Sequence, residues 1–247
     1  MINNNALLLS GIAGFSTLIG FLITLIIKNR NNNKIIAFIL SISSAIILYL
    51  SVFELAKESY IIMRNDYTLI YSTIYVLKLI IIGVIIGFLL EVLINKLSKN
   101  KYSKLIKLSI FATIALFLHN IPEGIITYIS TLTNLKLGLL ITFAIMIHNI
   151  PEGIIISLPI LVENNNIKKA FKYTFLAGFA EIIGTLIALM FFKDKFNELL
   201  LSNLISIISG IMIFISIYEI FPNALNYNKR ITIYTFVITL TMLILLL

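Results

Sequence analysis

Two identical six-residue segments contain the residues of this chain that are best suited to chemistry. The sequence HNIPEG occupies residues 119–124 and again residues 148–153, and the two copies contain both histidines of the protein. In each copy the histidine and the glutamate are four residues apart, which places imidazole and carboxylate on one face of a helix, one turn apart. The proline between them removes one helical hydrogen bond and is expected to kink each helix.

Each segment offers an imidazole nitrogen, an amide oxygen and a carboxylate oxygen, which together suit a divalent metal of borderline hardness. The alternative is that these polar groups only pair across helices as structural contacts. Because two identical copies use every histidine, a shared metal or proton site is favoured. The candidate ligands are His119, Asn120, Glu123, His148, Asn149 and Glu152. Glu181, which lies in an apolar run between Gly178 and Gly184, is a further candidate, with hydrogen bonding to a Ser or Thr as its alternative.

The composition is that of an integral membrane protein. Of 247 residues, 60% are hydrophobic and only 12% are charged, against about 25% charged in soluble domains. The absence of cysteine excludes disulfides and thiolate metal sites. A net charge of +8 would suggest nucleic acid as a partner of a soluble protein, but here the basic residues fall in short loops beside apolar spans, so the partner is the lipid bilayer. The excess of Ile, Asn and Lys is typical of an AT-rich bacterial genome.

Eight apolar segments are long enough to cross a bilayer, which takes about 20 residues. We expect an all-α polytopic membrane protein with a single transporter domain over residues 1–247, in which the first apolar run is a span and not a cleaved signal. The expected spans are 6–27, 34–57, 72–94, 107–130, 136–162, 168–192, 203–222 and 231–247. If the N-terminus is extracytoplasmic, the inner loops hold 13 basic residues and the outer loops four. The positive-inside rule therefore predicts that both termini are extracytoplasmic.

A weaker repeat links the second and seventh spans, where Ser51 and Ser216 each precede a glutamate by three residues. These spans cross the membrane in opposite directions, as do the fourth and fifth. This predicts a 3+2+3 inverted repeat around two central kinked helices, an arrangement typical of transporters with a midplane site. Glu54 and Glu219 could either pair structurally or line a pathway. Glu91 is expected to reach toward water.

Two glycines in the third span, Gly83 and Gly87, form a GxxxG pattern. Such a pattern predicts a close helix contact, either inside the chain or in a homodimer.

The doubled HNxPEG segment resembles the ZIP (Zrt/Irt-like) divalent-metal transporters and is most similar to their bacterial ZupT-type branch. Gly178-x-x-Glu181 resembles the sixth helix of the family, and residues 216–222 and 51–59 resemble the seventh and second. The resemblance implies eight helices in a 3+2+3 arrangement, both termini outside, and import of divalent metal through a binuclear site. It implies a first metal at His119, Glu123, His148 and Glu152, and a second at Asn120, Asn149, Glu181 and the two shared glutamates.

Two positions depart from the family pattern. Lys57 stands where the second helix of the family usually has proline, and the loop between the third and fourth spans has no histidine.

The ligand types limit the metals that the protein is expected to carry. We expect a transporter of Zn, Fe(II), Mn or Co, because nitrogen and oxygen ligands suit these ions and Cu(I) prefers thiols. Its carboxylates can take up protons when metal leaves. The alternative, a membrane-embedded metalloenzyme, would need an open coordination position and a general base.

Overall fold

The computed structural model describes residues 4–27, 32–98, 103–191 and 198–246, and these residues form helices and short connections without a strand. Eight helical segments are long and apolar enough to cross a membrane, which confirms the predicted all-α polytopic fold. They run over Asn4–Ile26, Asn33–Asp66, Leu69–Lys96, Leu105–Leu132, Leu135–Asn164, Ile167–Phe191, Ser202–Tyr227 and Lys229–Leu246. Contacts between residues divide the chain into two compact units.

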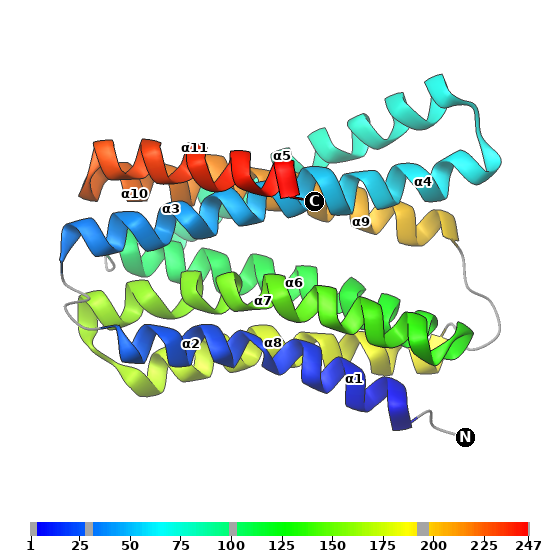
Figure 1. Cartoon of the computed structure of the whole chain (residues 1–247), viewed down its shortest axis with the longest axis horizontal. Helices are drawn as coiled ribbons and strands as arrows, with labels where there is room; N and C mark the ends of the chain where they lie inside the picture. Colours follow the sequence, from blue (N-terminus) through cyan, green and yellow to red (C-terminus); the bar gives the residue numbers. More distant parts are fainter. Residues whose placement is uncertain (1–3, 28–31, 99–102, 192–197, 247) are drawn as a thin grey trace. The chain divides into compact units, whose positions relative to one another are not determined.

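Unit 1 comprises residues 1–27 and 112–197 and contains both HNIPEG segments. Its elements are α1 (Asn4–Phe15), α2 (Thr17–Ile26), α6 (Lys104–Thr133) from Ala112 onward, α7 (Leu135–Asn164) and α8 (Ile167–Phe191). The two blue helices α1 and α2 lie against the green α7 and the yellow-green α8 (Figure 1). Both central helices continue through their prolines, Pro122 in α6 and Pro151 in α7.

Glycines bring the backbones of unit 1 into direct contact. At Gly124 of α6 the backbone of Glu181 in α8 leaves no room for a Cβ atom, and at Gly153 of α7 the backbone of Thr17 does the same. Small residues at such crossings are the usual basis of helix packing in membranes, where no hydrophobic effect drives association. The HNIPEG helices are therefore held against α8 and α2 at the position of the motif itself.

The first predicted span is one segment of two helices, interrupted at Ser16. The Ser16 hydroxyl donates to the carbonyl of Ala13, 2.6 Å away, and lies 3.2 Å from that of Met146 in α7. A serine hydroxyl that bonds to nearby carbonyls competes with the helical ladder and can interrupt it. The apolar pattern alone did not predict this interruption.

Unit 2 comprises residues 28–111 and 198–247. Its elements are α3 (Asn33–Tyr49), η1 (Leu50–Ala56), α4 (Lys57–Asp66), α5 (Leu69–Ser98), the first two turns of α6, α9 (Glu198–Phe214), η2 (Ile215–Ile220), α10 (Phe221–Tyr227) and α11 (Lys229–Leu246). Within this unit α5 packs on α9, and α3 packs on α11.

The second span is longer than predicted, because the helix does not end at Lys57 but continues to Asp66. The predicted span ended at Lys57 because charged residues follow the apolar run there. A helix, however, continues as long as its backbone hydrogen bonds form, whether or not its side chains are apolar. The backbone N–H of Lys57 donates to the carbonyl of Glu54 and so continues the helical hydrogen bonding. Glu54 consequently lies well inside a helical segment that runs from Asn33 to Asp66.

Both Ser-x-x-Glu repeats coincide with a change of helix type. The segments η1 and η2 are π-helical and contain Ser51 to Glu54 and Ser216 to Glu219 respectively. Short π-helical insertions in α-helices occur frequently at functional sites. The weak sequence repeat thus corresponds to a shared backbone feature.

Buried serines join the two π-containing spans. The Ser44 hydroxyl donates to the carbonyl of Ser216 at 3.0 Å, and the Ser216 hydroxyl donates back to the carbonyl of Ser44 at 2.8 Å. Ser209 donates to the carbonyl of Ser51 at 2.8 Å. A further reciprocal pair joins Ser59 and Ser202. These interhelical bonds satisfy polar groups inside an apolar unit.

The two glycines of the GxxxG pattern pack against another helix of the same chain. A Cβ atom at Gly83 would overlap the backbone of Ile207 and Gly210 in α9, and one at Gly87 would meet the ring of Phe214. The predicted helix contact is confirmed within the chain, so this pattern supplies no free face for a homodimer.

Candidate metal centre

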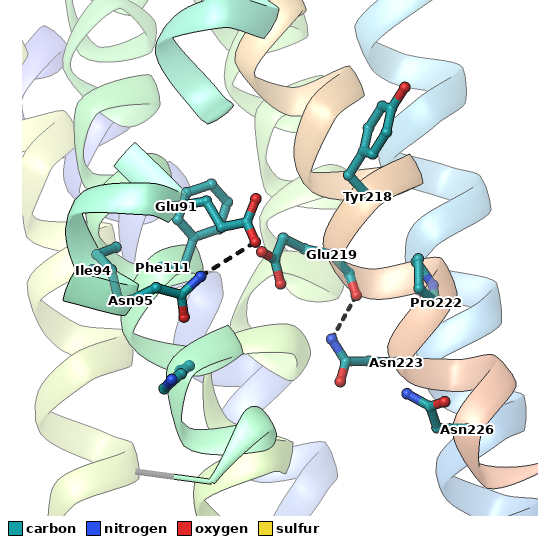
Figure 2. Close-up of a pocket in the computed structure, with 10 residues that line it drawn as sticks. Glu91, Ile94, Asn95, Phe111, Tyr218, Glu219, Pro222, Asn223 and Asn226 are labelled. Atoms are coloured by element: carbon teal, nitrogen blue, oxygen red, sulfur yellow. Dashed lines mark hydrogen bonds between the residues drawn. The ribbon is translucent and has the colours of Figure 1, made fainter. Parts of the chain in front are cut away.

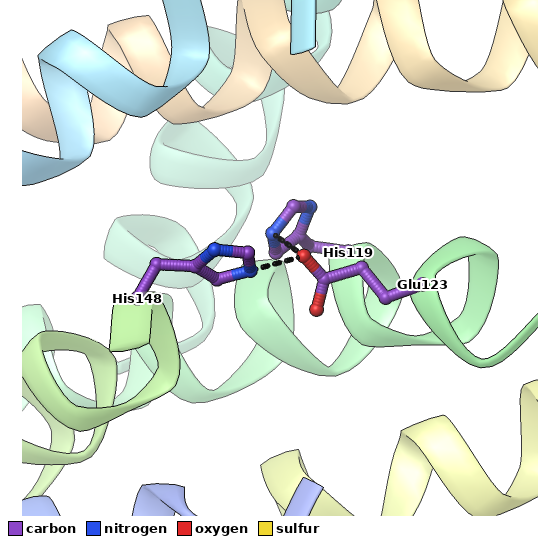
Figure 3. Close-up of side chains that lie close together, drawn as sticks. All are labelled: His119, Glu123 and His148. Carbon is purple, nitrogen blue, oxygen red and sulfur yellow. Dashed lines mark hydrogen bonds and ion pairs between the residues drawn. The ribbon is translucent and has the colours of Figure 1, made fainter. Parts of the chain in front are cut away.

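The two HNIPEG segments meet inside unit 1. His148 Nε2 of α7 lies 2.6 Å from Glu123 Oε1 of α6, and His119 Nε2 lies 3.1 Å from the same oxygen (Figure 3). The three side chains are almost entirely buried and offer ligand atoms within 4.8 Å of one another. Two imidazoles and one carboxylate converging on one point form a geometry suited to a divalent cation.

Glu152, the second glutamate of the repeat, has a looser place in this cluster. Its Oε1 lies 3.5 Å from His119 Nε2, and neither of its carboxylate oxygens has a hydrogen-bond partner among the described residues. The two repeated glutamates are therefore unequal, since Glu123 contacts both histidines and Glu152 contacts one. The sequence, in which the two copies are identical, gave no sign of this difference.

The two asparagines of the repeat tie the segments to neighbouring helices. Asn120 donates to the carbonyl of Ala177 in α8 at 3.0 Å, and Asn149 donates to the carbonyl of Ala13 in α1 at 2.9 Å. The Asn149 amide also donates to Glu181 Oε1. Glu181 is thus partnered by an amide, and not by the serine or threonine considered from the sequence.

Several oxygens at this place lack a hydrogen-bond partner among the described residues. They are Asn120 Oδ1, Asn149 Oδ1, Glu123 Oε2, both oxygens of Glu152, and Glu181 Oε2. A buried acceptor without a donor costs free energy comparable to a lost hydrogen bond, and an unpaired carboxylate inside a membrane protein costs more. All of these atoms are acceptors, so a bound cation or a hydrogen-bond donor would satisfy them, which is compatible with a cation-binding site.

Two hydroxyls that the sequence did not single out hold the backbone beside the site. Ser10 of α1 donates to the carbonyl of Glu181, and Thr185 of α8 donates to the carbonyl of Gly124, both at 2.9 Å. They position the α6–α8 crossing that the glycine permits. The sequence indicated this role only through Thr185, whose hydroxyl lies one helical turn after Glu181.

Unit 2 contains a separate pair of carboxylates. Glu219 and Glu91 line a cavity of about 320 Å³ with Asn95 and Asn223 (Figure 2). Asn95 donates to Glu91 at 3.3 Å, and Asn223 donates to the Glu219 carbonyl at 2.7 Å. Glu219 therefore lines a polar cavity and lies beside a second carboxylate, Glu91.

Comparison with known proteins identifies the family. The family model described as ZIP zinc transporter matches residues 96–246, more than half of the chain. The chain belongs to the ZIP family.

Bacterial ZIP relatives match nearly the whole chain. The zinc transporter ZupT of Oceanobacillus iheyensis is 37% identical over 240 residues, covering 91% of this chain and 89% of the relative. ZupT of Campylobacter jejuni is 33% identical over 91% of this chain and 88% of its own, and ZupT of Streptococcus mutans is 34% identical over 91% and 89%. The predicted resemblance to the ZupT-type branch is confirmed.

Membership of the ZIP family settles the class of function. This ZIP protein is a multi-pass membrane transporter of divalent metal, and the alternative of a membrane-embedded metalloenzyme is not supported.

Proposed function

We propose that this ZIP protein imports a divalent transition metal, with zinc as its first candidate, across a bacterial cell membrane through a binuclear site inside unit 1. The observation that carries the proposal is the convergence of His119, Glu123 and His148 at a buried point. Named relatives are zinc transporters. Fe(II), Mn and Co share the same preference for nitrogen and oxygen ligands.

The first metal of the proposed site binds between the two histidines, with Glu123 as the shared ligand. When a metal ion arrives, both imidazoles must present a deprotonated nitrogen, and binding therefore releases protons. Glu152, 3.5 Å from His119 and otherwise without a partner among the described residues, completes this set.

The second metal of the proposed site binds on the asparagine side. Asn120, Asn149 and Glu181 each keep one buried oxygen without a hydrogen-bond partner in the described part of unit 1. Glu123 and Glu152 have second oxygens with which they could bridge the two positions. Oxygen ligands of mixed amide and carboxylate type suit the harder members of the candidate set.

Paired contacts in unit 1 support the predicted 3+2+3 inverted repeat. Asn149 bonds to the carbonyl of Ala13, and Asn120, its equivalent in the other copy, bonds to that of Ala177. The next residues, Gly14 and Gly178, face each other. These pairs relate α1 to α8, the first to the sixth span.

Unit 2 repeats the same relation. The Ser44–Ser216 pair corresponds to the Ser209–Ser51 pair when the second span is placed on the seventh. We include this inverted repeat in the proposal and treat residues 1–247 as one transporter domain built from both units.

Replacing either histidine tests the function. We expect His119→Ala and His148→Ala to reduce metal uptake into proteoliposomes by about 100-fold or more, because each removes a ligand where even outer-shell changes cost about 10–100-fold. Ser157→Ala is the matched control, since Ser157 is equally buried on α7 and bonds to Thr24. Wild-type uptake and wild-type metal affinity in both histidine variants, at equal protein content, would show that the assignment is wrong.

Orientation is tested separately. We propose that both termini are extracytoplasmic, since 13 basic residues fall in the loops that would then be inner and four in the outer loops. A cysteine introduced at Ser98 into this cysteine-free chain should react with an impermeant maleimide only after cells are opened. One introduced at Asp66 should react in intact cells. The reverse labelling pattern would contradict the orientation.

A further inference from the structure

Two spans of unit 2 begin side by side and form a groove at their starts. α3 begins at Asn33 and α11 at Lys229, and the two helices pack against each other (Figure 1). The groove has a volume of about 480 Å³, and its lining includes Lys34, Phe38, Arg230 and Tyr234.

The charge of this groove has one sign. Lys34 and Arg230 are both exposed, and the described residues that line the groove include no carboxylate. The Arg230 guanidinium lies 5.8 Å from the centre of the Tyr234 ring, which holds the cation beside the groove. Two unneutralised cations across one groove would attract an anion between them.

One turn further along each helix the groove becomes apolar. Phe38 is 49% exposed and Tyr234 is 59% exposed, and both follow their basic residue by four positions. Basic residues at the helix starts, followed one turn later by exposed aromatic side chains, match an anionic headgroup with acyl chains attached. An inorganic anion would contact only the basic residues.

The proposed orientation of the chain places this end in the cytoplasmic leaflet, because both basic residues follow loops that the charge count assigns to the inside. That leaflet carries the anionic phospholipids of a cell membrane, and basic pockets between spans on this side suit their headgroups. A second copy of the chain is a weaker candidate, since it would have to supply carboxylates to pair Lys34 and Arg230.

We propose that the groove between the starts of α3 and α11 binds an anionic phospholipid of the cytoplasmic leaflet. Lys34 and Arg230 hold the phosphate, and Phe38 and Tyr234 contact the acyl chains. The proposal is independent of the metal centre, which lies in unit 1.

The absence of tryptophan from the chain makes a direct test simple. Tyr234→Trp introduces a single reporter, and the variant is reconstituted in phosphatidylcholine vesicles that contain either brominated phosphatidylglycerol or brominated phosphatidylcholine. Bromine quenches tryptophan at short range. We expect brominated phosphatidylglycerol to reach half-maximal quenching at a mole fraction about 30-fold lower than brominated phosphatidylcholine does, which corresponds to about 1 kcal/mol from each of the two basic residues.

Charge-matched variants identify the groove as the source of the preference. Adding Lys34→Gln and Arg230→Gln should abolish it, while Lys168→Gln with Lys172→Gln, two exposed lysines of α8 in unit 1, should leave it unchanged. Equal quenching by the two lipids, or a preference that survives loss of Lys34 and Arg230, would overturn the proposal. So would protection of the reporter from both lipids together with a dimeric mass, which would indicate a second copy in the groove.

Discussion

Glu123→Gln is expected to lose nearly all bound metal and nearly all transport. Glu123 Oε1 lies within 3.1 Å of both histidine Nε2 atoms, and Oε2 is without a hydrogen-bond partner among the described residues, so this carboxylate could bridge the two proposed metal positions. An amide removes the negative charge and leaves excess positive charge in a buried site, which is costly. We expect metal affinity to fall by more than about 100-fold.

Variants of the other two carboxylates, Glu181 and Glu152, are the controls, and they should rank below Glu123 in their effect on bound metal and transport. Glu181→Gln should keep the first metal with reduced or altered transport, because Glu181 accepts a hydrogen bond from Asn149, whereas the histidine ion pairs in the described part of the chain go to Glu123 and Glu152. Glu152→Gln should be intermediate, given its single 3.5 Å contact with His119. The measurement is metal content of the purified variants together with initial uptake rates. Complete loss of metal from Glu181→Gln beside full retention in Glu123→Gln would refute the two-metal geometry.

Gly124→Ala is expected to be strongly destabilising, although it adds one methyl group. That methyl would overlap the carbonyl of Glu181, a backbone atom that cannot move without separating α6 from α8. Overpacking against backbone should cost about 3 kcal/mol, at the upper end for such changes. For a chain of this length this corresponds to a fall of about 10 °C in Tm.

Gly11→Ala is the matched control for this substitution. It lies in α1 of the same unit, and its Cβ would meet only Ile182 Cδ1 at an ordinary 3.9 Å. We expect its Tm to be unchanged or slightly higher, because alanine favours the helix. Equal Tm values for Gly124→Ala and Gly11→Ala would show that the α6–α8 contact is looser than described. Metal content of surviving Gly124→Ala protein should fall, since Glu181 shifts with its backbone.

The clustering of the repeated histidines and glutamates could be predicted from the sequence. Each HNIPEG segment is a local pattern whose meaning depends only on helical spacing, and its exact duplication indicated two halves of one site. The structure brings His119, Glu123 and His148 together as expected. The eight spans were equally accessible, because bilayer thickness fixes their length.

Features that depend on other helices were not predictable. The interruption at Ser16 involves the carbonyl of Met146, which is 130 residues away in the chain. The π-helical form of η1 leaves no signature beyond a serine and a glutamate. The inequality of Glu123 and Glu152 arises from packing alone, since the two residues have identical neighbours in sequence.

The crossing glycines of unit 1 give the proposed site a direction. Gly124 packs on the backbone of Glu181, and Gly153 packs on that of Thr17. In the proposed inverted repeat, therefore, Thr17 occupies the position that Glu181 has in the other half. A cation held between the two halves would be attracted toward α8, because the carboxylate of Glu181 stands on that side and the neutral hydroxyl of Thr17 stands on the other. The symmetry of the backbone would make the two faces of the membrane equivalent at this point, and the difference between Thr17 and Glu181 would help to distinguish them.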